Sequence, residues 1–141
     1  MQKTWFGIIL VAYKTNPTRI LLVENTKSGN ISPVSGALED SENHLDALLR
    51  EAKEEVNWDI DSSKVKQTNI EYSFIFGSNK PERAGDKGQY KVFLYNADLQ
   101  AEPQTTKDTK SPVWISKNEV LSKIKFDDLK EVLAKALDSI T

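Results

Sequence analysis

The alternation of hydrophobic and polar residues predicts several strands and at least two helices along the chain. Two apolar runs rich in β-branched residues come first, at Trp5–Tyr13 and Arg19–Glu24. The link between them contains Asn16 and Pro17, which are typical turn residues, so the two runs are expected to form a buried hairpin. A further short strand is expected at Ile31–Ser35.

Apolar residues at three- and four-residue spacing then predict an amphipathic helix from about Asn43 to Val56. Asn43 is a favourable N-cap, and Asp46 stands three residues later, where it completes a capping-box-like pair. Asn57 follows the last apolar position, and asparagine tolerates the left-handed conformation that commonly ends a helix.

The second half of the chain predicts more strands and a C-terminal helix. Strands are expected at Tyr72–Phe76, Gln89–Ala97 and Val113–Ile115, with a polar loop at Gly77–Gly88, a helix over Lys117–Ile124, and a final amphipathic helix from Asp127 or Asp128. The resulting order, β-β-β-α-β-β-β-α, indicates a single domain of the α/β (α+β) class over residues 1–141. In it, a mixed sheet carries helices on both sides.

Composition narrows the possible functions. The formal net charge is −2, so bulk attraction to nucleic acid or to an anionic membrane is not expected, and a polyphosphate substrate would need bound cations. The chain has no cysteine, which excludes disulfides, thiolate metal sites and a cysteine nucleophile. The apolar N-terminal run is too short for a membrane span and lacks a cleavage site, so a cytoplasmic protein is expected.

Three glutamates on the first predicted helix are the main candidates for chemistry. Glu51, Glu54 and Glu55 follow an i, i+3, i+4 spacing, which places them on one face. Their mutual repulsion would be offset by a divalent cation, and Mg²⁺ prefers carboxylate oxygens together with substrate phosphates. The alternative is a solvated face in which Arg50 or Lys53 pairs with a glutamate, and the helix by itself leaves both interpretations open.

The loop before this helix brings in a family resemblance. The segment from Ser35 to Trp58 resembles the Nudix signature GX5EX7REUXEEXGU, in which U is a bulky aliphatic residue. The initial glycine and all the charged positions match, namely Gly36, Glu42, Arg50, Glu51, Glu54 and Glu55. Pro33 and Glu39 also resemble the usual loop of this family.

Three positions depart from the signature. Ala52 stands at the first aliphatic position and keeps the buried face apolar. Asn57 replaces the late glycine, and asparagine is the next best residue at a left-handed helix end. Trp58 is aromatic where an aliphatic residue is usual, which we interpret as a packing change.

The resemblance implies a Nudix-type α/β/α sandwich and a hydrolase that uses Mg²⁺ or Mn²⁺ to cleave a diphosphate linkage. By analogy with the family, the metal ligands are Ser35, through its carbonyl, and Glu51, Glu54 and Glu55. The same glutamates and Arg50 are the catalytic candidates, and Arg50 is expected to orient loop carboxylates rather than substrate. Loop support is assigned to Gly36, Glu39 and Glu42.

Many relatives use another acid from a distant loop. Asp108 and Glu102 are the main candidates, and Glu82 and Glu119 are further ones, although each is individually expected to be a solvated acid. The single histidine, His44, is expected to be an exposed bystander at the helix start.

The substrate is less well defined. The loop and helix sequences resemble dihydroneopterin triphosphate pyrophosphohydrolases, whereas Lys87-Gly88-Gln89 resembles a stretch of dinucleoside-polyphosphate and RNA 5′-end pyrophosphohydrolases. Because these two resemblances disagree, a nucleoside triphosphate is the first substrate to test, and a nucleotide sugar is a further alternative. A small-molecule nucleotide is the expected partner. A catalytically silent binding module is the alternative of another class, but such modules usually carry a broken signature.

Candidate substrate contacts are aromatic or basic. Aromatic faces stack on bases, so Tyr72, Phe74, Phe76 and Phe126 are candidates for base recognition, although core packing is the more common use. The candidates for phosphate contacts in the polar loop are Lys80, Arg83 and Lys87.

Overall fold

The structure is a computed structural model that describes residues 1–78 and 80–140. Asn79 of the predicted polar loop and Thr141 at the end of the predicted domain lie outside the described residues. The elements in chain order are β1 (Thr4–Lys14), β2 (Arg19–Asn25), β3 (Ile31–Ser32), β4 (Val34–Ala37), α1 (His44–Val56), η1 (Ser62–Lys64), β5 (Val65–Ile75), β6 (Lys87–Asn96), β7 (Thr109–Ser116), η2 (Val120–Lys123) and α2 (Asp127–Asp138).

Within the described residues, seven strands form one mixed sheet with the order β3-β2-β1-β6-β5. β1 pairs with β6 in parallel, from Thr4↔Lys87 to Tyr13↔Asn96, and the other pairs are antiparallel. β7 adds to β2, and β4 adds to β1. In β4, Ser35 pairs with Ile9 and Gly36 pairs with Ile8, so the motif glycine lies beside the central strand β1.

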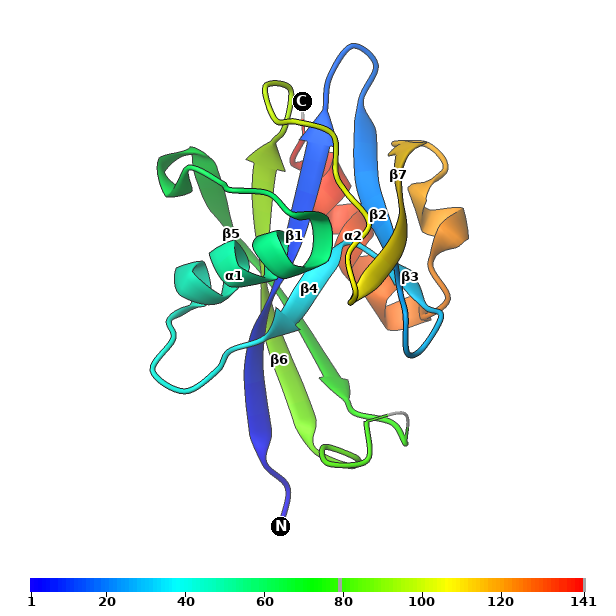
Figure 1. Cartoon of the computed structure of the whole chain (residues 1–141). Coiled ribbons are helices and arrows are strands. Elements are labelled where there is room, and N and C mark those ends of the chain that lie inside the picture. Colours follow the sequence, from blue (N-terminus) through cyan, green and yellow to red (C-terminus); the bar gives the residue numbers. More distant parts are fainter. Residues whose placement is uncertain (79, 141) are drawn as a thin grey trace.

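The two faces of the sheet enter two separate cores, because successive strand residues point to opposite sides. The core on the α1 side contains Ile8, Leu10, Phe93, Tyr95, Leu48, Val56 and Trp58. The core on the α2 side contains Ile9, Val11, Tyr90, Val92, Leu94, Leu133 and Leu137. Figure 1 shows α1 and α2 on opposite faces of the sheet, which confirms the predicted mixed sheet with a helix on each side.

The ends of α1 are formed as the sequence predicts. The Asp46 N–H donates to Asn43 Oδ1 at 2.8 Å, and the Asn43 N–H donates to Asp46 Oδ2 at 3.3 Å, which completes a capping box. Asn57 ends the helix in the left-handed region with φ 59°. Its side chain donates to Gln104 Oε1 at 2.7 Å, so the helix end is tied to a distant loop.

Three predicted elements need correction. The helix predicted over Lys117–Ile124 forms only in part: the segment is a turn followed by the short 3₁₀ helix η2, and Val120 and Ile124 are buried in the core on the α2 side. The strand predicted at Tyr72–Phe76 begins earlier, at Val65, and ends at Ile75, because β5 pairs with β6 on both sides of an irregularity between Gln67 and Glu71. The strand predicted at Ile31–Ser35 is interrupted at Pro33, which has no N–H to continue a ladder.

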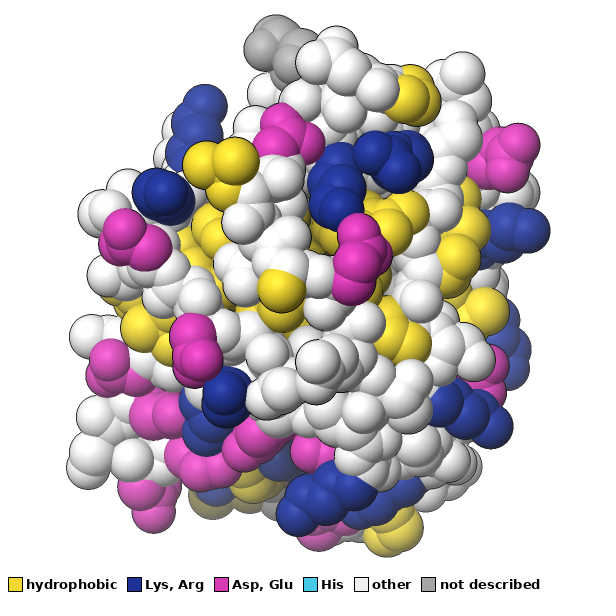
Figure 2. All heavy atoms as spheres, turned by 45° about the horizontal axis from the view of Figure 1, so that its top comes forward, with side chains coloured by type: hydrophobic (Ala, Val, Ile, Leu, Met, Phe, Trp, Pro, Cys, Tyr) yellow, Lys and Arg dark blue, Asp and Glu magenta, His cyan; other side chains and the backbone are white. Residues whose placement is uncertain are grey.

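The surface carries both signs of charge. Figure 2 shows acidic and basic side chains interspersed on the face in view, with acidic ones gathered toward its lower left. This mixture agrees with the formal net charge of −2. No helix in residues 1–78 and 80–140 is both long enough and apolar enough to cross a membrane.

Candidate active site

The motif residues converge on one cavity of about 610 Å³. It lies between β4 with its following loop, one face of α1, and the β5–β6 region. The predicted site residues that line it are Ser35, Gly36, Glu39, Arg50, Glu51, Glu54, Glu55 and Asp108. Glu42 lies behind this lining and acts on it through Arg50.

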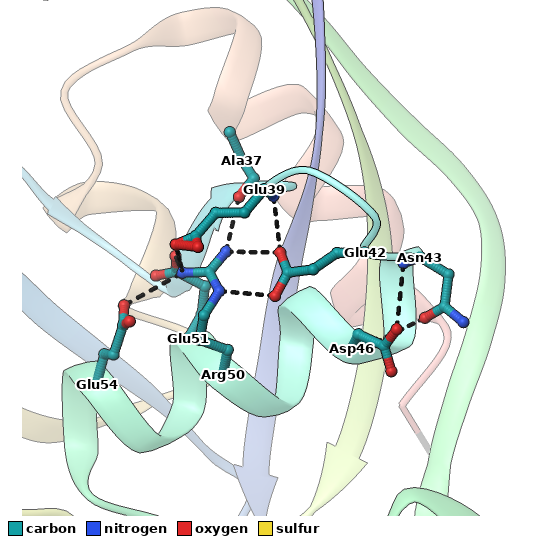
Figure 3. Close-up of polar contacts among 8 residues, drawn as sticks. All are labelled: Ala37, Glu39, Glu42, Asn43, Asp46, Arg50, Glu51 and Glu54. Atoms are coloured by element: carbon teal, nitrogen blue, oxygen red, sulfur yellow. Dashed lines mark hydrogen bonds and ion pairs between the residues drawn. The ribbon is translucent and has the colours of Figure 1, made fainter.

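Arg50 is the centre of the polar network drawn in Figure 3. Its Nε and Nη2 donate to the two carboxylate oxygens of Glu42 at 2.8 and 3.0 Å, which is the bidentate geometry of a strong pair. Nη2 also donates to the carbonyl of Ala37 at 2.9 Å. Hydrogen bonds with Glu42 first, and the charge of Glu51 after them, raise the pKa of Arg50 above its ordinary value, so it stays charged.

The same guanidinium holds the helix carboxylates. Nη1 donates to Glu51 Oε1 at 2.7 Å and to Glu54 Oε2 at 3.2 Å, and it lies 3.4 Å from Glu39 Oε1. The Glu39 N–H in turn donates to Glu42 Oε1 at 2.7 Å. Arg50 therefore links the loop to one turn of α1, while its part in catalysis stays a prediction.

Gly36 is needed because β4 and α1 approach closely at this point. A Cβ atom on Gly36 would collide with the carboxyl group of Glu51. Gly36 is needed only for space, because its backbone φ is not positive. Among the described glycines, positive φ occurs at Gly29 and Gly85. The absence of a side chain at position 36 thus lets the Glu51 carboxylate lie directly against the strand.

Glu55 is a buried acid, with only 8% of its surface exposed. Burial raises its pKa well above the ordinary value, and the neighbouring Glu51 adds to this shift through a hydrogen bond and through charge repulsion. The backbone N–H of Ser35 opposes the shift by hydrogen bonding to the carboxylate. An ionised carboxylate in this position needs a proton or a cation to offset its desolvation.

Glu54 and Asp108 add negative charge to the same place. Burial and the charge of Glu51 raise the pKa of Glu54, and Arg50 opposes this shift. The charge of Asp108 contributes to the raised pKa of both Glu54 and Glu55, so Asp108 lies near them. Asp108 comes from the loop before β7, where its carbonyl accepts from the Thr26 N–H at 3.2 Å.

The donor set fits a hard divalent ion, because it consists of carboxylates beside a strand backbone. In the part of the chain that the structure describes, no three acidic or histidine side chains already converge closely enough to ligate one ion. Figure 3 shows the guanidinium of Arg50 between Glu51 and Glu54, with a hydrogen bond to each. Arg50 engages one oxygen of each carboxylate, so the second oxygen of Glu51 and of Glu54 is not held by Arg50.

The other acids named from the sequence lie elsewhere. Glu102 accepts from Lys14 Nζ at 2.7 Å and from Trp114 Nε1 at 3.1 Å, and it is not among the described residues that line the cavity. Neither Glu82 nor Glu119 belongs to that lining. His44 is half-buried rather than exposed, lies in a separate hollow, and has a pKa lowered first by burial and then by Lys91.

Aromatic side chains form another wall of the cavity. Tyr72 and Phe74 stack with ring centroids 4.7 Å apart, and Phe74 meets Tyr90 edge to face at 5.1 Å. The Tyr72 hydroxyl donates to Asp128 Oδ1 at 3.1 Å, and burial, followed by this carboxylate, raises the pKa of Tyr72. Tyr72, Phe74, Phe76 and Phe126 were candidates from the sequence, and all four line the cavity.

Two lining residues could not be found from the sequence. Tyr90 follows the alternation of a core strand, so its pattern predicts only burial, although its ring reaches the cavity. Burial raises the pKa of Tyr90 to about 12. Asp128 looks like an ordinary first-turn helix acid, and only the fold brings it to Tyr72.

The chain is similar in sequence to known proteins. The family model described as the NUDIX domain matches residues 5–137. The mRNA-decapping enzyme subunit 2 of Saccharomyces cerevisiae is 29% identical over 126 residues, which cover 81% of this chain. The match spans only 11% of the length of that protein.

Solved structures share the fold at low identity. The dihydroneopterin triphosphate pyrophosphohydrolase of E. coli has a TM-score of 0.81 at 16% identity, with 95% of each chain covered. An Ap4A hydrolase of C. elegans has a TM-score of 0.74 at 16% identity, covering 96% of this chain and 97% of that one. A NUDIX hydrolase from Nitrosomonas europaea has a TM-score of 0.73 at 18% identity, covering 97% and 90%. Together with the domain match over nearly the whole chain, they establish that this protein belongs to the Nudix hydrolase family.

Proposed function

We propose that this protein hydrolyses a diphosphate linkage in a nucleotide-like substrate with the help of Mg²⁺ or Mn²⁺. The observation that carries the proposal is the buried carboxylate of Glu55, which lies beside Glu51 in an open cavity with a raised pKa. Such an arrangement destabilises the ionised form unless a cation is present, and it is typical of functional rather than structural acids.

The residues of the chain have separate roles in this proposal. Glu51, Glu54, Glu55 and the carbonyl of Ser35 would hold the ion. A divalent ion in this place neutralises charge on phosphate oxygens and lowers the pKa of water. Arg50 positions Glu51 and the loop through its pair with Glu42. Asp108 is our candidate for accepting the proton of the attacking water, because its side chain lines the same cavity from another loop.

A nucleoside triphosphate is the first substrate to test. The cavity volume of about 610 Å³ lies within the ordinary range for small-molecule sites, and the aromatic wall offers a stacking surface for a base. The names of similar proteins refer to different substrates, so dinucleoside polyphosphates, dihydroneopterin triphosphate and nucleotide sugars belong to the same panel. A small-molecule partner and a cytoplasmic location are part of this proposal.

The test is hydrolysis of that panel with Mg²⁺, followed by identification of both products. Pyrophosphate, orthophosphate or two monophosphates each identify a different cleaved bond. The Glu55→Gln variant should lose turnover, whereas Glu131→Gln, which changes an exposed acid of α2, should retain it. Absence of turnover on the whole panel, combined with tight binding of one nucleotide, would instead identify a binding module.

A further inference from the structure

Two arginines line the cavity, and they differ in whether their side-chain N–H groups have hydrogen-bond partners. Arg50 donates to two carboxylate oxygens of Glu42, to Glu51 and to a backbone carbonyl. Arg83, by contrast, has a buried Nε with no hydrogen-bond partner among the described residues. The Glu82 carboxylate lies 4.0 Å from this Nε, which is beyond hydrogen-bonding distance. A buried donor without a partner is costly, and it needs an explanation at a cavity wall.

Aromatic rings hold the guanidinium of Arg83 in place. Its Cζ lies 4.3 Å from the ring centroid of Trp5 and 5.5 Å from that of Phe76. The Trp5 ring is itself fixed, because its Nε1 donates to Asp86 Oδ2 at 2.9 Å. Only 22% of the Arg83 side chain is exposed. Stacking of this kind orients an arginine while leaving the N–H groups at its edge available to two oxygens of a carboxylate or phosphate.

Arg83 and the carboxylates lie on different sides of the same cavity. The carboxylates come from α1, whereas Arg83 and Lys80 come from the loop between β5 and β6. Tyr90 lies within reach of both groups, since the charge of Arg83 lowers its pKa and the charges of Glu51 and Glu55 raise it. The cavity is therefore acidic on the α1 side and basic on the side of this loop.

We propose that Arg83 binds a phosphate group of the substrate other than the two joined by the cleaved linkage. The guanidinium fork matches two phosphate oxygens, and its orientation is already set before the substrate arrives. The protein then prefers nucleotides with three or more phosphates to those with two, such as nucleoside diphosphates or nucleotide sugars. This inference rests on the proposed function for its substrate class, but the Arg83 contact does not need the metal.

Kinetics on paired substrates test the preference. Arg83→Gln should raise KM for a nucleoside triphosphate by about 10- to 100-fold, with kcat changed by less than about 3-fold, because a charge-assisted contact to substrate is lost. KM for the matching diphosphate should stay unchanged. Arg19→Gln, on β2 outside the cavity, is the matched control. Equal effects of Arg83→Gln on both substrates would overturn the preference.

Binding without metal separates this inference from the proposed function. In EDTA, calorimetry should show that the wild type binds inorganic triphosphate and that Arg83→Gln binds it at least about 10-fold more weakly. Arg83→Lys, which keeps the charge and loses the fork, should fall between them. Equal affinity of wild type and Arg83→Gln, or no binding by the wild type, overturns the role of Arg83. A protein that passes this test and hydrolyses nothing refutes only the proposed function.

Discussion

Glu55 is a carboxylate in a place where an ionised carboxylate is costly. Its side chain is buried, and its pKa is raised first by burial and then by the acid Glu51, while the Ser35 N–H lowers it. Because its folded-state pKa is raised, the protonated form contributes stability below the ordinary pKa, and this stability is lost as pH rises through the raised value. At neutral pH a bound cation would replace the proton, so ion binding and proton release should be linked.

The variant Glu55→Gln should separate stability from activity. Loss of the negative charge should cut turnover by at least about 100-fold, because an essential ion ligand is removed. In the absence of metal the same variant should be more stable than the wild type at pH 7.5 by about 1 kcal/mol, since no charge is left buried. Thermal unfolding with EDTA and steady-state kinetics with Mg²⁺ check the two parts. Wild-type rates in this variant would exclude the proposed site.

The pKa of Glu42 is shifted downward, in the direction opposite to that of Glu55. Its hydrogen bonds from Arg50 lower its pKa, so its ionised form contributes stability above the ordinary value of 4.5 that is lost as pH falls through the lowered value. Glu42→Gln should therefore lower the free energy of unfolding at pH 7 by about 1–3 kcal/mol, because charge-assisted hydrogen bonds from Arg50 are lost between side chains that are mostly buried. The difference from wild type should shrink toward pH 3. Urea unfolding at both values measures it, and a difference independent of pH would contradict this assignment.

At the scale of elements, α1 was predictable because its signals are local. The capping box at Asn43 and the left-handed Asn57 depend on residues within one turn, and both form as predicted. Only the 3₁₀ turn Val120–Lys123 of the helix predicted over Lys117–Ile124 forms, although Val120 and Ile124 are buried, so the apolar positions predicted burial and not the type or length of the helix. The start of β5 was missed because its first half is polar and follows β6 only through pairing.

Some features of the candidate site were also predictable from the sequence, and others were not. The spacing of Glu51, Glu54 and Glu55 is visible in the sequence, and the three line one cavity. The contacts of Tyr72 with Asp128 and of Arg83 with Trp5 join segments far apart in the chain. No local pattern encodes such pairs, so only the fold reveals them.

The left-handed end of α1 gives a test at this scale. Asn57→Val should lower the free energy of unfolding by about 1–3 kcal/mol, since a β-branched residue is strained at φ 59°. Asn57→Gly should differ from the wild type by less than about 1 kcal/mol, because glycine relieves strain but loses the bond to Gln104. Urea denaturation compares the two, and equal stability of Asn57→Val and Asn57→Gly would contradict the importance of this conformation.

At the scale of the whole molecule, the sheet separates two cores and supports one cavity that draws on both halves of the chain. α1 and the loop before β7 supply the carboxylates, while β5 and β6 supply most of the aromatic residues and the loop between them supplies Lys80 and Arg83. The fold is shared with relatives whose names refer to different substrates, so the fold does not set specificity. We expect the aromatic and basic residues that line the cavity, such as Tyr72 and Arg83, to set it.

We expect the carboxylates of α1 to bind a divalent ion. Binding of Mn²⁺ at pH 7.5, followed by the electron paramagnetic resonance of the free ion, tests it directly. We predict that the wild type and Glu131→Gln bind Mn²⁺ alike and that Glu55→Gln binds it at least about 10-fold more weakly. Equal binding by the wild type and Glu55→Gln, or no binding by the wild type even with a nucleotide present, would contradict the claim.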